Sequence, residues 1–221
     1  IRLKLFNIKK EERKPVLILF IQFFSVVATS ITGSTARDAF FLNLFDRSYL
    51  PLMFVAIAIT MVIVINIYKR ITDGKNIIQV ITVSGAMFAG LLLIIQLSLT
   101  RLFSIYSDGG GADAIAALPE KWVIPILFIL MEVIVSLSIL QFWMLAGEVF
   151  DARQAKRLFS ILGAGGSVAG MLAGYSLKPF VKTFGSDKLL YLTIIFIGMY
   201  VFMGLLINKY QEPEEDQKQK Q

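Results

Sequence analysis

The chain has 221 residues, of which 56% are hydrophobic and 17% are charged, and its mean hydropathy is +0.70. Soluble proteins carry roughly 45–50% apolar and about 25% charged residues, so this composition indicates an integral membrane protein. The net charge is +6, and neither cysteine nor histidine occurs. Their absence excludes disulfide frameworks, Cys- or His-based nucleophiles and the common zinc and haem sites. We therefore expect no cofactor, no metal ion and no enzymatic activity.

Six apolar segments are long enough to cross a bilayer, which requires about 20 helical residues at ~1.5 Å each. They cover residues 15–36, 50–68, 77–100, 122–148, 158–181 and 189–207. This pattern predicts an all-α, six-helix membrane domain over residues 15–208. A basic arm, residues 1–14, precedes it and suits either an interfacial helix or a solvated segment. Residues 108–117 read as a glycine-rich outer loop, and the charged tail, residues 209–221, is expected to be disordered or a linker.

Basic residues gather in short segments on one side of the predicted membrane domain. If the N-terminus is cytoplasmic, fifteen of the 22 Lys and Arg residues fall inside, as the positive-inside rule requires. We therefore expect both termini to be cytoplasmic. Because these basic residues separate apolar spans and do not form one continuous face, we expect no nucleic acid as a partner.

The first span carries a polar stripe at steps of three and four residues, which places its members on one helix face. They are Gln22, Ser25, Thr29, Gly33 and Arg37. Such a face indicates a water-filled pathway or a helix–helix contact. Arg37, at the outer end, could bind an anionic substrate in a bidentate manner. The alternative is an interfacial arginine that reaches lipid headgroups or pairs with Asp38 or Asp46.

The fourth span carries Glu132 about ten residues from its start. A carboxylate at that depth must face water, a partner or a substrate, because hydrocarbon does not solvate charge. Ser136 and Trp143 share its helix face. One interpretation makes Glu132 a substrate contact, a coupling acid or the counter-ion of Arg37. The other makes it an inter-helix salt bridge, or a protonated, hydrogen-bonded carboxyl, that only fixes packing.

The loop after the fourth span is rich in charge. It contains Glu148, Asp151, Arg153 and Arg157. We expect these residues to form a gate at the cytoplasmic side, with Glu148 paired to Arg153 or Arg157.

The fifth span is rich in glycine. A dinucleotide-binding fingerprint is excluded because that motif follows a β-strand, whereas these glycines follow a basic loop into an apolar run. We expect four of them to let helix backbones approach closely. They are Gly163, Gly166, Gly170 and Gly174. The alternative is an unwound turn over residues 163–166 whose N–H groups face an anion.

Two stretches resemble a known transporter family. Residues 141–166 begin Gln-Phe-Trp-Met-Leu-Ala-Gly-Glu-Val-Phe-Asp, and residues 35–42 read Thr-Ala-Arg-Asp-Ala-Phe-Phe-Leu, followed by Phe45-Asp46 and Leu50-Pro51. Both resemble the ATP:ADP antiporter family, in its bacterial major-facilitator-like branch. The resemblance implies the N-terminal half of a 12-span carrier in a bacterial inner membrane, exchanging nucleotides by alternating access.

The resemblance also implies site residues and partners. Members of the family place a basic residue on the first helix and an acid on the fourth, which correspond to Arg37 and Glu132. We expect Gln22, Thr29 and Trp143 to contact the substrate with them. Expected partners are the lipid bilayer, a nucleotide or other organic anion, and a second six-helix half in the same chain or in another subunit. The alternative function is a non-transporting scaffold or interaction subunit of a larger membrane complex.

Overall fold

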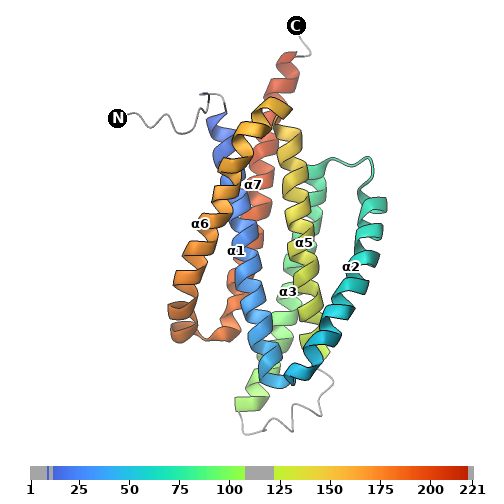
Figure 1. The fold of residues 1–221 in the computed structure, drawn as a ribbon, viewed down its shortest axis with the longest axis vertical. Coiled ribbons are helices and arrows are strands. Elements are labelled where there is room, and N and C mark those ends of the chain that lie inside the picture. Colours follow the sequence, from blue (N-terminus) through green and yellow to red (C-terminus); the bar gives the residue numbers. More distant parts are fainter. Residues whose placement is uncertain (1–8, 10–11, 108–121, 219–221) are drawn as a thin grey trace.

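The computed structural model describes residue 9, residues 12–107 and residues 122–218, and all regular structure in these ranges is helical (Figure 1). The long helices are α1 (Arg13–Leu44), α2 (Leu50–Thr72), α3 (Ile77–Ser107), α5 (Val123–Val149), α6 (Ala152–Phe184) and α7 (Leu189–Lys218). Short 3-10 turns, η1 (Arg47–Tyr49) and η3 (Ser186–Lys188), lead into α2 and α7. Within the described ranges, six helices are long and apolar enough to cross a membrane. The predicted all-α class is confirmed for the described residues, as is the presence there of six helices long and apolar enough to span a bilayer.

Local sequence sets where the helices begin and end. Asp46 caps η1 by accepting the backbone N–H of Ser48 at 2.8 Å, and α6 begins with a capping box between Asp151 and Gln154. The turn after α2 and the residue after α6 both require positive φ. Gly74 (φ 70°) and Gly185 (φ 88°) provide it without the steric cost that a side chain would add.

The two ends of the chain differ in part from the sequence-based expectation. Helix α7 continues to Lys218, so much of the tail expected to be disordered is helical, in keeping with its Gln, Glu and Lys content. Most of the basic arm and the whole glycine-rich segment 108–117 lie outside the described residues. The described part of the arm begins α1 at Arg13, and the preceding Glu12 is buried.

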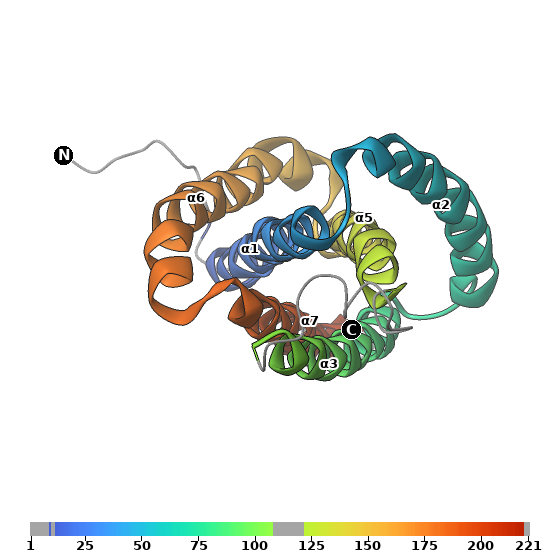
Figure 2. The same cartoon turned by 90° about the horizontal axis from the view of Figure 1, so that it is seen from below.

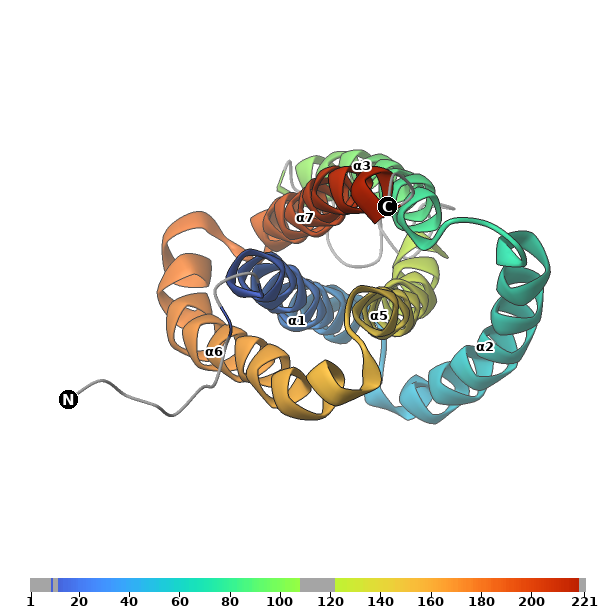
Figure 3. The same ribbon diagram turned by 90° about the horizontal axis from the view of Figure 1, so that it is seen from above.

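Helix α1 is the central element of the bundle. It packs against α7, α6 and α5, while α3 packs against α7 and α5. Helix α2 contacts mainly α5 and has a single buried residue, Met53. The end views show α2 and α6 on opposite flanks, with the other four helices between them (Figures 2 and 3). The functional residues therefore have to be sought where α1 meets its neighbours.

The apolar core forms two clusters stacked along the bundle axis. One surrounds the end of α1 and the start of α5 and includes Phe40, Phe41, Phe128 and Met131. The other surrounds the start of α1 and the end of α5 and includes Leu19, Phe142, Leu145 and Leu162. Buried polar side chains lie between and beside the two clusters. They include Gln22, Ser25, Thr29, Thr32, Ser138, Gln141 and Thr193.

Candidate functional site

An ion pair joins α1 to α5 beside the first apolar cluster. Arg37 Nη1 donates to Glu132 Oε1, and Arg37 Nε donates to Asp38 Oδ1 at 3.0 Å. The guanidinium carbon lies 4.3 Å from the centroid of the Phe128 ring, an arrangement that favours a cation. The Arg37 side chain is 10% exposed and that of Glu132 is 33% exposed. The intramembrane acid thus faces a basic partner from another helix, and the structure brings together the two residues that the resemblance singles out.

Helices α1 and α5 lie close together at the level of the Arg37–Glu132 pair. A Cβ atom added to Gly33 would collide with the side chain of Met131, which is fully buried. Because Gly33 has no side chain, α1 can approach α5 at this level. Arg37 follows Gly33 by one helical turn, and Glu132 directly follows Met131. Gly33 therefore leaves room for the Met131 side chain one helical turn from Arg37.

A hydrogen-bonded group, the Gln141 network, links four helices closer to the other end of the bundle. Gln141 Nε2 donates to Ser84 Oγ at 2.9 Å, and Tyr200 Oη donates to Gln141 Oε1 at 3.0 Å. Gln22 Nε2 donates to the Tyr200 carbonyl at 3.4 Å. Among the described residues, the buried Tyr68 hydroxyl has no hydrogen-bond partner. Sequence reasoning identified Gln22 but not Ser84 or Tyr200, because neither belongs to a periodic polar pattern.

Two buried oxygens on α1 lack partners. Neither Gln22 Oε1 nor Thr29 Oγ1 has a hydrogen-bond partner among the described residues, and the two side chains are almost completely buried. Leaving a buried polar group unpaired costs about 1–3 kcal/mol. The polar stripe therefore carries unused hydrogen-bonding capacity at two of the positions predicted to contact a substrate.

Trp143 lies away from the charged residues. It is three helical turns beyond Glu132 on α5, about 16 Å along the helix axis. Its ring packs with Phe23 at 5.5 Å, and with Phe142 and Phe159 at 5.2 Å each, measured between centroids. The structure thus places Trp143 in an aromatic contact of α1, α5 and α6. The shared helix face predicted for Glu132 and Trp143 does not make them neighbours.

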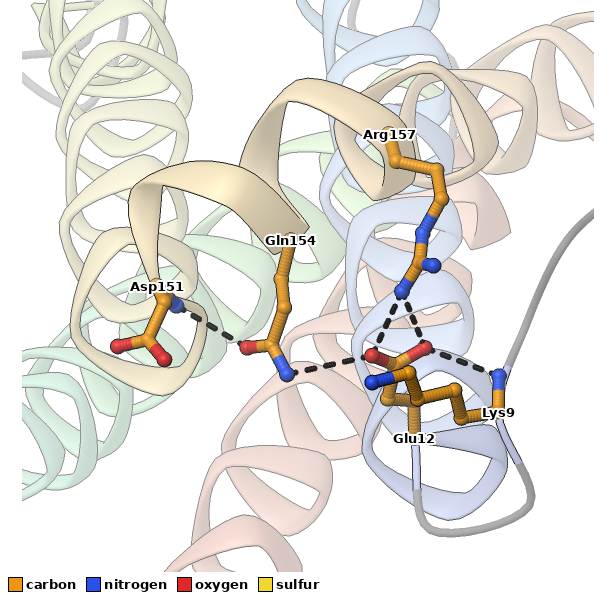
Figure 4. A network of polar contacts seen from close by, with 5 residues as sticks. All are labelled: Lys9, Glu12, Asp151, Gln154 and Arg157. Atoms are coloured by element: carbon orange, nitrogen blue, oxygen red, sulfur yellow. Dashed lines mark hydrogen bonds and ion pairs between the residues drawn. The ribbon is translucent and has the colours of Figure 1, made fainter.

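A second ion pair ties the start of α1 to the start of α6 (Figure 4). Arg157 Nη2 donates to both carboxylate oxygens of Glu12, each at 2.6 Å. Gln154 Nε2 donates to Glu12 Oε1 at 3.2 Å, and the Lys9 backbone N–H donates to Oε2 at 3.0 Å. These contacts bury Glu12 although it stands in a strongly basic segment. Sequence reasoning missed it for that reason, since nothing in the basic run distinguishes this acid from a solvated one.

The Glu12 contact corrects the gate expected at this end. Arg157 pairs with Glu12 and not with Glu148, which is exposed. Asp151 serves as the N-cap of α6, and Arg153 is exposed. The difference arises because α6 packs against α1, which brings its first turns to Glu12.

The environment of Glu12 favours its charged form. Burial raises the pKa of the Glu12 carboxyl, but the Lys9 N–H, the Arg157 charge and the Gln154 amide together hold that pKa below its ordinary value. At the opposite end, the backbone N–H of Ser48 lowers the pKa of Asp46. Both carboxylates are therefore ionised at neutral pH.

The glycines of α6 divide into two groups. A Cβ atom on Gly165 would lie 2.7 Å from the Phe20 carbonyl, and one on Gly166 would lie 2.8 Å from the Phe23 ring. No such neighbour lies within 4 Å at three other positions. These are Gly163, Gly170 and Gly174. Close packing against α1 therefore rests on residues 165 and 166, whereas a side chain at the other three positions would begin in open space.

No family model, curated protein or solved structure matches this chain. Among the described residues, no group of three metal-ligating side chains comes together. The geometry of α1 and its neighbours, together with the two stretches that resemble a transporter family, is therefore the basis for a functional proposal.

Proposed function

We propose that the chain is a carrier unit that moves an organic anion of the nucleotide type across a membrane by alternating access. The Arg37–Glu132 pair carries the proposal, because it holds a guanidinium inside the bundle against a partly exposed carboxylate. Phosphate and carboxylate groups bind guanidinium in the same bidentate manner. An incoming anion would displace Glu132 from Arg37, and Glu132 would return when the anion leaves.

The polar stripe of α1 supports this proposal. Gln22 Oε1 and Thr29 Oγ1 have no partner among the described residues, and both lie on the helix that carries Arg37. They offer hydrogen bonds to the polar groups of a substrate as it passes along α1. Neutral hydrogen-bonding groups suit a sugar or a base, whereas the cation suits phosphate.

A complete pathway requires a second set of helices. The resemblance suggests another six-helix half, in the same chain or a partner, and a bacterial inner membrane with both termini cytoplasmic. The start of α1 and the end of α7 lie at one end of the bundle (Figure 1), and Lys14 lies over the Tyr210 ring there. That arrangement suits an even number of spans.

Exchange of labelled ATP tests the proposal. The protein, purified together with the second six-helix half, is reconstituted into liposomes loaded with ADP, and uptake of external labelled ATP is measured. We expect exchange by the wild type and its loss in Glu132→Gln. Ser136→Ala, one turn away on α5, serves as the matched control and should keep its flux. Absence of exchange with every nucleotide tested would contradict the proposal.

A scaffold role is the second candidate, and one observation favours it. Arg37 is almost fully buried and already contacts two carboxylates of its own chain, Glu132 and Asp38. A pair satisfied in this way could serve packing alone. Purification as a permanent member of a larger membrane complex, together with no flux in that complex, would favour the scaffold.

A further inference from the structure

A cavity of about 470 Å³ lies between α2 and α3, and Leu137 of α5 contributes to its lining. Its volume falls within the roughly 300–1,000 Å³ typical of small-molecule sites. We propose that it binds one anionic phospholipid, with an acyl chain between α2 and α3 and the headgroup at Lys75. This site is separate from the Arg37–Glu132 pair and does not depend on the proposed carrier function.

The lining is polar and charged at one end and mainly apolar further along the helices, where Tyr68 and Ser84 are its polar members. Thr72, Lys75 and Gln79 line the cavity where α2 ends and α3 begins. Further along, Val64 on α2 and Met87 on α3 line it. Both helices are membrane-spanning, so the polar end lies at the interface and the apolar part lies in hydrocarbon. A phospholipid has the same order of polarity along its length.

Weak packing of α2 leaves this space open to the bilayer. Met53 is the only buried residue of α2, and it does not line the cavity. Two lining residues of α3 are largely exposed, Val83 at 70% and Met87 at 54%. An apolar space of this kind does not hold water well. A hydrocarbon chain entering sideways from the bilayer would bury these surfaces.

The charge at the polar end selects the headgroup. Lys75 lines the cavity, and Lys69 and Arg70 lie exposed in the last turn of α2. Asp73 is the one acid in residues 69–76, so the segment keeps an excess of positive charge. Basic side chains at a membrane interface attract anionic lipids. The site should therefore prefer phosphatidylglycerol to phosphatidylcholine.

Native mass spectrometry of the purified, delipidated chain tests the lipid site. Phosphatidylglycerol and phosphatidylcholine with identical acyl chains are titrated separately. We expect one tightly held phosphatidylglycerol, bound about fivefold more strongly than phosphatidylcholine. Val83→Phe, which fills the cavity, should weaken binding of both lipids at least fivefold. Ile94→Phe, at an exposed position of the same helix outside the cavity, should leave binding unchanged.

A second variant tests the headgroup contact independently of cavity shape. Lys75→Gln changes an exposed side chain and should abolish the preference for phosphatidylglycerol while chain binding remains. Lys156→Gln removes an exposed charge from α6 and should preserve the preference. Equal binding of the two lipids to the wild type would overturn the proposal, as would equal binding by Val83→Phe and Ile94→Phe.

Discussion

Arg37 and Glu132 neutralise each other's charge within the bundle, but removal of one is not equivalent to removal of the other. Arg37 is the more deeply buried partner, and it also contacts Asp38 and the Phe128 ring. Removing Glu132 leaves the guanidinium with one carboxylate. Removing Arg37 leaves two acids together and removes the cation from the ring.

This asymmetry predicts unequal losses of stability. Arg37→Met should lower the free energy of unfolding by about 3 kcal/mol, as expected when one partner of a buried pair is removed. Glu132→Gln should cost about 1 kcal/mol, because its amide can still accept a hydrogen bond. Thermal unfolding in detergent measures both, with exposed Arg47→Met as the control. Equal losses for the two variants would contradict the greater dependence of the bundle on Arg37.

The Glu12–Arg157 pair predicts a dependence of stability on pH. The pKa of Glu12 is lowered in the folded chain, so its stabilisation is complete above the ordinary value of about 4.3 and disappears as pH falls through the lowered value. Glu12→Gln should therefore cost about 2 kcal/mol at pH 7. The difference from the wild type should shrink below about pH 4.

Melting temperatures measured from pH 8 to pH 3 check this dependence. Asp73→Asn, which changes an exposed acid between α2 and α3, provides the control and should change little. A difference for Glu12→Gln that stays constant down to pH 3 would show that the ion pair is not its source.

At the scale of helices, α6 offers a direct comparison of two glycines. Gly165→Ala should destabilise the bundle, because its Cβ would meet the Phe20 backbone carbonyl and force α6 away from α1. Gly170→Ala meets no atom within 4 Å and should be neutral, or stabilising by up to about 1 kcal/mol through helix propensity. Melting temperatures of the two variants decide the matter. Equal losses of stability in the two variants would show that contact with α1 is not the reason for glycine at position 165.

The helices themselves could be predicted because length and apolarity determine them locally. The predicted spans agree with the observed helices, and the α1 stripe faces inward as its spacing indicated. The contacts between helices were harder to predict. Ser84, Tyr200 and Glu12 acquire partners through the rotation and depth of one helix against another, which hydropathy does not specify. The contacts of Trp143 could not be predicted for the same reason, because they depend on how α5 is rotated against α1 and α6.

At the scale of the whole molecule, orientation is the first property to test. The chain has no native cysteine, so a single introduced cysteine reports its own position. With both termini cytoplasmic, a membrane-impermeant thiol reagent added to intact cells should label Lys188→Cys but not Asp73→Cys. Both positions are exposed, so labelling should depend on the side of the membrane. The reverse pattern would contradict the orientation inferred from the basic residues.

In the proposed carrier, Glu132 balances the charge of Arg37 within the membrane, and Arg37 must also be available to the substrate. Exchanging the two charges, as Arg37→Glu with Glu132→Arg, separates these requirements. The double variant restores an attractive pair between α1 and α5, but it moves the guanidinium to the other helix. A packing role needs only the attraction, whereas substrate recognition needs the cation on α1.

The most direct measurement is the rise in melting temperature that millimolar ATP produces in the wild type and in this double variant. Ligand that binds only the folded chain raises its stability in proportion to the logarithm of ligand concentration over Kd. We predict a rise of several degrees for the wild type and none for the double variant, whose melting temperature without ATP should exceed that of Arg37→Glu alone because the pair between α1 and α5 is restored. No rise for the wild type, or the same rise for both, would contradict the assignment of Arg37 and Glu132 as a substrate site.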